Sequence, residues 1–192
     1  SPGWEYPAVA VLEENSNRES RSMKMRLSIL VMGCLMLAVA MPARAQEAAD
    51  RWGPQIEQFE QSDREQPPEK GGILFIGSSS IRLWDTDTCF PEQQPINRGF
   101  GGSQISDVNA YADRIVFPYA PSVIVFYAGD NDVAKGKPAK RVADDFRKFG
   151  ERVAERLPDC QLIYIPIKPS LSRWTMWPTM NEANRLIAKY LE

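Results

Sequence analysis

The sequence contains no histidine among its 192 residues, and this absence excludes more chemistry than any other feature of its composition. Histidine is the usual general base near neutral pH and the commonest neutral metal ligand. Zinc sites built on histidine are therefore excluded for these residues. Cysteine is also scarce, with three residues in the chain, so the sequence does not describe a disulfide-dense scaffold.

An excess of charge of either sign is likewise lacking. The chain has 23 Lys and Arg against 25 Asp and Glu, a net charge of −2, and no basic block stands out. We therefore expect no nucleic-acid partner, because such proteins carry a positive stripe. The hydrophobic fraction of 43% is ordinary for a globular protein and excludes extensive disorder. The length predicts one domain.

An apolar stretch near the start of the chain has the pattern of a secretory signal peptide over residues 23–45. Lys24 and Arg26 precede an apolar run at 27–41, and PARA at 42–45 supplies a small-residue cleavage site after Ala45. The run is shorter than the roughly 20 residues that span a bilayer, so we expect no stable membrane insertion after cleavage. Acylation of Cys34 is disfavoured because the apolar run continues past it. We expect export to the periplasm or the medium, with residues 1–22 an upstream non-native segment.

The remaining chain divides into an N-terminal helix and linker at 46–70 and a main domain at 71–192. Near-continuous apolar runs predict four strands buried on both faces, at 72–76, 95–98, 122–128 and 161–167. Helical patterns fill the intervals, with Ser103 expected to cap the helix that runs to about Phe117 and further helices at 138–157 and 178–191. The helix at 138–157 is expected to carry an apolar face of Val142, Phe146, Phe149, Val153 and Leu157. This alternation predicts an α/β fold, a three-layer α/β/α sandwich with a parallel sheet.

Polar and glycine-rich segments follow the first three predicted strands. They read GSSS at 77–80, GFGGS at 99–103 and GDND at 129–132. Ligands bind outside the carboxyl ends of the strands in open parallel sheets, so these segments should meet at one edge. A serine on a tight turn exposes its hydroxyl, a glycine lets a backbone N–H approach closely, and an asparagine donates a further hydrogen bond. This set suits acyl transfer.

Three blocks in order, FIGSSSI at 75–81, NRGFGG at 97–102 and GDND at 129–132, resemble the SGNH (GDSL-type) hydrolases, and most closely the platelet-activating-factor acetylhydrolase-like branch. The resemblance covers about residues 72–191 and implies a flavodoxin-like sheet. It also implies that Ser79 is the nucleophile, and that the amides of Ser79 and Gly102 and the side chain of Asn131 form an oxyanion hole. The family's aspartate before the nucleophile is Ser78 here.

The family's last block, Asp-x-x-His, supplies the catalytic base and has no match in this sequence. We therefore expect a domain incomplete at its C-terminus, and a chain that is close to inactive by itself. The resemblance implies a serine esterase that acts on small acyl esters, and the leader pattern adds export. An acetyl group on a carbohydrate is the favoured case because of that leader pattern and of Trp174 and Trp177 in the loop after the fourth predicted strand. The resemblance implies no metal or organic cofactor. The alternative is a non-catalytic carbohydrate- or ligand-binding domain derived from such a hydrolase.

Several residues carry two interpretations. Ser79 is either the nucleophile or the cap of the helix that follows it. Asp130 and Asp132 are interpreted as turn and capping residues, with a carboxylate pair for metal or acid–base work as the alternative. Trp174 and Trp177 form either a stacking platform for the substrate or part of the loop packing. The loop at 99–103 lacks the spacing of a dinucleotide site. Whether Cys89 pairs with Cys160, and the oligomeric state, stay open.

Overall fold

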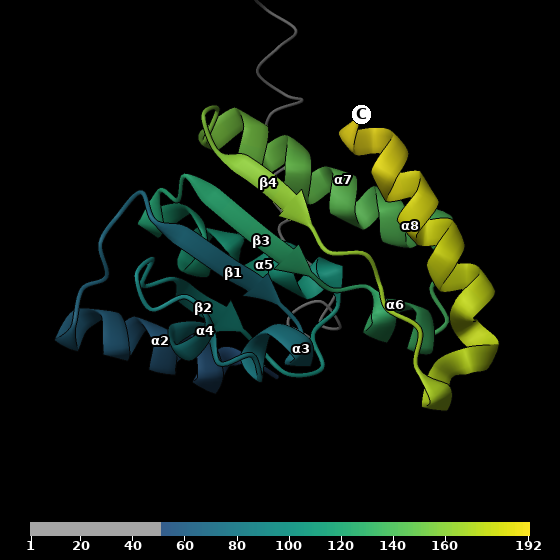
Figure 1. The fold of residues 1–192 in the computed structure, drawn as a ribbon, viewed down its shortest axis with the longest axis horizontal. Coiled ribbons are helices and arrows are strands. Elements are labelled where there is room, and N and C mark those ends of the chain that lie inside the picture. The colour runs from purple at the N-terminus through teal and green to yellow at the C-terminus, as the bar shows by residue number, and fades with distance from the viewer. Residues whose placement is uncertain (1–50) are drawn as a thin grey trace, which may run out of the picture. The chain divides into compact units, whose positions relative to one another are not determined.

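Four parallel strands form the central layer of the part of the chain that the computed structural model describes, residues 51–192 (Figure 1). Their order in the sheet is β2-β1-β3-β4, and all three pairings are parallel. The bounds are Ile73–Gly77 for β1, Ile96–Gly99 for β2, Val123–Tyr127 for β3 and Gln161–Tyr164 for β4. The predicted parallel sheet is confirmed, whereas the predicted leader at 23–45 lies outside the described residues.

The last strand is shorter than the predicted run at 161–167. The backbone N–H of Ile165 still donates to the Phe126 carbonyl, at 2.9 Å. Pro166 comes next and has no N–H, so it cannot continue the ladder. The N–H of Ile167 then donates to the side chain of Asn184, at 2.8 Å, instead of to a strand. The proline therefore ends the strand and directs the chain away from the sheet.

Helices cover both faces of this sheet, which confirms the three-layer α/β/α sandwich. Helices α2, α5, α7 and α8 pack on one face, and the short α3 and α4 lie on the other. None of the helices in residues 51–192 is long and apolar enough to cross a membrane. The bounds are Gly53–Glu65 (α2), Ser79–Arg82 (α3), Thr86–Cys89 (α4), Ile105–Ile115 (α5), Asp130–Ala134 (α6), Ala139–Arg156 (α7) and Trp177–Leu191 (α8), with 3₁₀ turns at Phe117–Tyr119 (η1) and Leu171–Met176 (η2).

The larger core lies between the sheet and α7. Phe126 on β3 contacts Phe146 and Phe149, with ring centroids 5.2 and 4.9 Å apart. The predicted apolar face of this helix is confirmed, because Val142 and Val153 are buried beside the two phenylalanines. Burying such side chains contributes roughly 1.5–3 kcal/mol each, so this face anchors the helix on the sheet.

The opposite face of the sheet is covered more thinly. Phe75 on β1 packs against Trp84 and Phe90, with centroids 5.2 and 5.5 Å apart. Beyond this aromatic cluster, Leu83 is 71% exposed and Ile163 on β4 is 40% exposed. The apolar side chains of this face are thus less completely covered by residues 51–192 than those of the larger core.

The two cysteines in the described residues are not joined. Cys89 lies exposed at the end of α4, and Cys160 is half-buried just before β4. Burial raises the pKa of the Cys160 thiol. Both are free thiols in this structure, so they add no covalent link to the fold.

A buried ion cluster joins α6 to α5 and α7. The carboxylate of Asp132 is completely buried and lies 2.8 Å from the Lys137 ammonium, which also contacts Asp145 at 2.8 Å. Asp132 further accepts a hydrogen bond from the backbone N–H of Ile105, the first residue of α5. Burial raises the pKa of Asp132, and the hydrogen bond from Lys137 opposes this shift. The lysine therefore keeps a buried carboxylate compatible with the fold.

We predict that Lys137→Met destabilises the protein by about 3–5 kcal/mol, because it leaves Asp132 buried and unpaired. Lys140→Met is the matched control, since Lys140 pairs with Asp144 on the exposed face of α7. Such an exposed pair is worth about 0.3–0.5 kcal/mol. Urea unfolding of both variants measures the difference. Equal losses would contradict the role given to the cluster.

Candidate active site

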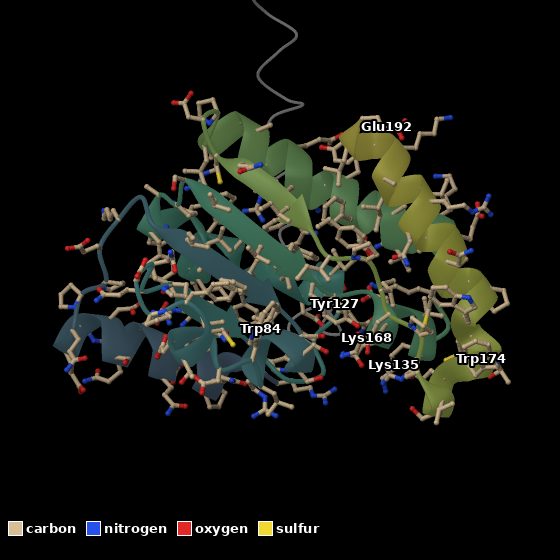
Figure 2. The ribbon with its side chains drawn as sticks, in the orientation of Figure 1. Trp84, Tyr127, Lys135, Lys168, Trp174 and Glu192 are labelled. Carbon is tan, nitrogen blue, oxygen red and sulfur yellow. The ribbon has the colours of Figure 1, made fainter. Side chains whose placement is uncertain are left out.

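The loops after β1, β2 and β3 meet at one edge of the sheet, as the sequence predicts. We call them the first loop (77–80), the second loop (99–103) and the third loop (129–132). The carbonyl of Gly77 accepts hydrogen bonds from the Phe100 N–H at 2.9 Å and from the Ser103 hydroxyl at 3.3 Å. The Ser78 N–H donates to the Tyr127 carbonyl at 2.9 Å. Figure 2 shows Tyr127 and Lys168 at this carboxyl end.

Glycine is required where the first two loops are closest to their neighbours. A Cβ on Gly77 would lie 1.9 Å from the Tyr127 carbonyl oxygen, and the φ of this residue is +144°. A Cβ on Gly99 would lie 2.3 Å from the backbone nitrogen of Arg82. No side chain fits at such distances. Gly77 therefore allows β1 to lie close to β3, and Gly99 allows β2 to lie close to α3, where the site is assembled.

Ser79 is the first residue of α3, and its side chain is partly exposed. The N-cap position belongs to Ser78, so the interpretation of Ser79 as the helix cap is wrong. Ser78 is fully buried, and its hydroxyl has no hydrogen-bond partner among residues 51–192. The amide of Ser79 has no intrahelical acceptor because the first turn of a helix leaves its N–H groups unpaired. It can donate to a ligand.

The second loop presents a backbone amide at Gly102. This residue has a φ of +79°, in the left-handed region that favours glycine. The indole N–H of Trp52 holds the loop by donating to the Gly101 carbonyl at 3.0 Å. The prediction that Ser103 caps the next helix is wrong, because the Ser103 hydroxyl donates to Gly77 instead. Gln104 caps α5 through a reciprocal pair with Asp107.

The third loop brings Asn131 to the second loop. Its Nδ2 donates to the Ser103 carbonyl at 3.1 Å, and its Oδ1 accepts from the Arg173 guanidinium at 3.1 Å. Arg173 also donates to Asp130, at 2.6 Å. Asp130 thus forms an ion pair with Arg173. Asp132 belongs to the buried ion cluster and accepts a hydrogen bond from the first residue of α5. Among residues 51–192, no group of three or more Cys, Asp or Glu side chains is arranged to hold a metal ion.

The segment after β4, residues 165–176, forms a fourth loop at the same edge. Trp174 is 59% exposed and stands apart from Trp84 and Tyr127 in Figure 2. Trp177 begins α8 and packs against the larger core, so packing is the observed role of this second tryptophan. The substrate role expected for Trp174 stays a prediction.

Sequence reasoning missed two basic residues of the fourth loop. Arg173 reaches Asn131, and the Lys168 ammonium lies 3.4 Å from the Ser80 hydroxyl and 5.7 Å from the Tyr127 ring centroid. The only signal in the sequence is their place after a strand at the carboxyl end of the sheet. The carboxyl end of β4 lies at the same edge as those of the first three strands, so the residues that follow it also face the site.

A cavity of about 440 Å³ opens beside Ser79. Its walls are apolar at Ile81, Trp84 and Ile165, and Lys168 lies at its margin. Burial raises the pKa of Tyr127, which also lines this cavity, and the nearby Asp130 adds to the shift. The phenol therefore stays protonated near neutral pH and does not act as a base. A second cavity of about 470 Å³ lies between α2 and β2 and includes none of Ser79, Gly102 or Asn131 in its lining.

No family model and no curated protein matches the sequence. Solved structures do match. A Streptococcus pneumonia protein assigned as a platelet activating factor aligns with a TM-score of 0.63 at 18% identity, over 80% of this chain and 76% of that one. A GDSL-like lipase from Bacteroides thetaiotaomicron aligns with a TM-score of 0.59 at 16% identity, over 71% of each chain. A lipolytic protein of the G-D-S-L family from Desulfitobacterium hafniense gives 0.54 at 15% identity, over 63% of this chain and 71% of that one.

These likenesses show the fold. The structural neighbours are GDSL-like lipases and acylhydrolases, and their sandwich is the one described above. At identities of 15–18% they do not carry residue roles or an activity to this chain. The roles of Ser79, Gly102 and Asn131 are therefore argued from their geometry.

We predict that Gly99→Ala destabilises the protein by about 1–3 kcal/mol, because the new methyl group would overlap the backbone of α3. Gly72→Ala is the matched control. It has no atom within 4 Å of the added Cβ and an ordinary φ, so its free energy of unfolding should change by about 0.5 kcal/mol or less. Thermal unfolding of the two variants distinguishes them. Equal midpoints would show that the first and second loops do not depend on this close approach.

Proposed function

We propose that this protein is a serine ester hydrolase of the SGNH (GDSL-type) family, in the platelet-activating-factor acetylhydrolase-like branch. Ser79 is its nucleophile, and the amides of Ser79 and Gly102 with the Nδ2 of Asn131 form its oxyanion hole. The observation that carries the proposal is the joining of the three loops by hydrogen bonds. The Gly77 carbonyl holds the second loop beside the nucleophile turn, and the Ser103 carbonyl holds Asn131 there at 3.1 Å.

The proposed reaction has two steps. The Ser79 hydroxyl oxygen attacks the ester carbonyl carbon and loses its proton to a base, and the carbonyl electrons move to the oxygen that the three donors face. The tetrahedral intermediate then expels the alcohol, which takes up the proton, and leaves an acyl-serine. Water hydrolyses this acyl-serine by the same sequence. Each oxyanion donor contributes roughly 2.7–4 kcal/mol where its removal has been measured in other enzymes.

The base is the part that these 192 residues do not supply, since they contain no histidine. We propose that a histidine and its orienting aspartate, in an Asp-x-x-His block, belong to a segment of the natural protein outside these residues. A serine hydroxyl without a base is a weak nucleophile near pH 7. The 192-residue chain alone should therefore hydrolyse esters slowly or not at all.

The proposed substrates are small acyl esters, with an acetyl group on a carbohydrate as the favoured case. The cavity beside Ser79 supports a small acyl group, because its apolar walls at Ile81, Trp84 and Ile165 suit a short hydrocarbon chain. Trp174 does not line this cavity, and its exposed indole on the fourth loop is the proposed contact for the sugar moiety. The leader pattern at 23–45 supports export.

A second candidate is a non-catalytic carbohydrate- or ligand-binding domain that keeps the same loops. Two observations favour it. The 192 residues lack a base, and Ser78 occupies the place of the family's aspartate with its buried hydroxyl unpartnered. In this candidate the three donors bind an anionic or carbonyl oxygen of the ligand without any covalent step.

We predict that a fluorophosphonate probe labels the full-length protein and that Ser79→Ala abolishes the labelling, because the probe reacts with activated serines. Ser80→Ala is the matched control, since Ser80 is the next residue of α3 and also lines the cavity. It should label as the unchanged protein does. Intact-protein mass spectrometry measures the adduct. A folded full-length protein that never labels would support the binding domain instead.

A further inference from the structure

Arg173 bridges the fourth loop and the third loop. It lies in η2, and its side chain is 31% exposed, so it is partly screened from solvent. One guanidinium nitrogen donates to Asp130 at 2.6 Å, and another donates to the Oδ1 of Asn131 at 3.1 Å. The planar fork of arginine matches this double contact, whereas the single ammonium of lysine does not.

The contact with Asn131 determines which end of its carboxamide faces the site. Oδ1 points to the guanidinium, and Nδ2 points to the Ser103 carbonyl at 3.1 Å. The reversed carboxamide would place its NH₂ against the guanidinium, donor to donor. It would also place its oxygen against the Ser103 carbonyl, acceptor to acceptor. The neighbours on both sides thus favour the same orientation.

We propose that Arg173 is a positioning residue that holds the Asn131 carboxamide with its NH₂ group toward the substrate; this rests on the proposed function of Asn131 as an oxyanion donor. The NH₂ group has two hydrogens, and the Ser103 carbonyl takes one. The second remains for the negative charge that develops on the ester oxygen. A donor oriented beforehand needs no reorganisation during the reaction and so acts on the transition state.

Asp130 completes the arrangement. Its carboxylate holds the guanidinium and balances its charge, so Arg173 is not a free cation for a substrate. Arg173 touches no reacting atom in this account and acts only through Asn131. Its loss should therefore lower kcat and leave KM nearly unchanged, because the ground-state ester depends little on the oxyanion donor.

The test uses the full-length protein with 4-nitrophenyl acetate. Arg173→Ala should lower kcat by about 10- to 100-fold, the loss expected for a hydrogen bond to a charged group, with KM within about twofold. Arg185→Ala is the matched control, because Arg185 forms an exposed ion pair with Glu182 on α8. It should leave both constants unchanged. A change in KM alone would overturn the proposal.

A double-mutant cycle separates positioning from other roles. If Arg173 acts through Asn131, then Arg173→Ala should cost nothing further in a protein that already carries Asn131→Ala. Millimolar guanidinium chloride should restore part of the kcat of Arg173→Ala and none of that of Asn131→Ala. Additive losses, or rescue of neither variant, would overturn the proposal.

Two further comparisons distinguish a folding defect, a failure of the proposed function and a failure of the positioning role. Thermal unfolding shows whether Arg173→Ala folds; should it not, Arg173→Lys replaces it in the cycle, with a smaller loss of kcat expected and the same criterion of non-additivity. If neither Ser79→Ala nor Asn131→Ala lowers the activity, the proposed function fails. If both lower it and Arg173→Ala does not, only the positioning role fails.

Discussion

The carbonyl of Gly77 is the point on which the assembly of the site depends. This one oxygen accepts a backbone and a side-chain hydrogen bond from the second loop, so it fixes that loop beside the first loop. Around it, a Cβ is excluded at Gly77 by the Tyr127 backbone of β3 and at Gly99 by the Arg82 backbone of α3. The geometry of the candidate site is thus set by close packing of the backbone, on which its side chains are placed.

The third loop is held in a different way, by charges. Asp132 is buried, contacts Lys137, and accepts a hydrogen bond from the first N–H of α5. Asp132 directly follows Asn131, so these contacts link the third loop to the helix that follows the second loop. A buried ion pair adds little net stability, because desolvation offsets most of the attraction. Its value lies in geometry. Its contacts join α5, α6 and α7 in an arrangement in which Asn131 lies against Ser103.

Much of this could be read from the sequence. Buried parallel strands leave near-continuous apolar runs, and the helical spacing at Val142, Phe146, Phe149 and Val153 identifies a face that is in fact buried. The meeting of three loops followed from parallel topology alone. What could not be read were contacts between side chains far apart in the chain. Arg173 contacts Asn131, which lies 42 positions away in the sequence. The Ser103 hydroxyl donates to the Gly77 carbonyl instead of capping a helix, and only the folded backbone shows which of these partners is nearer.

The two candidate functions differ in whether the proton of the Ser79 hydroxyl is transferred to a base. An oxyanion hole stabilises negative charge whether or not a base is present, and such sites retain about 10³- to 10⁴-fold catalysis over water when their triads are removed. In the proposed function, binding a carbonyl oxygen needs only the three donors of residues 51–192. Moving the Ser79 proton needs a base with a pKa near the working pH, and the protonated phenol of Tyr127 does not meet that condition. The proposed function thus separates oxygen binding from proton transfer, and it assigns oxygen binding to the loops around Ser79.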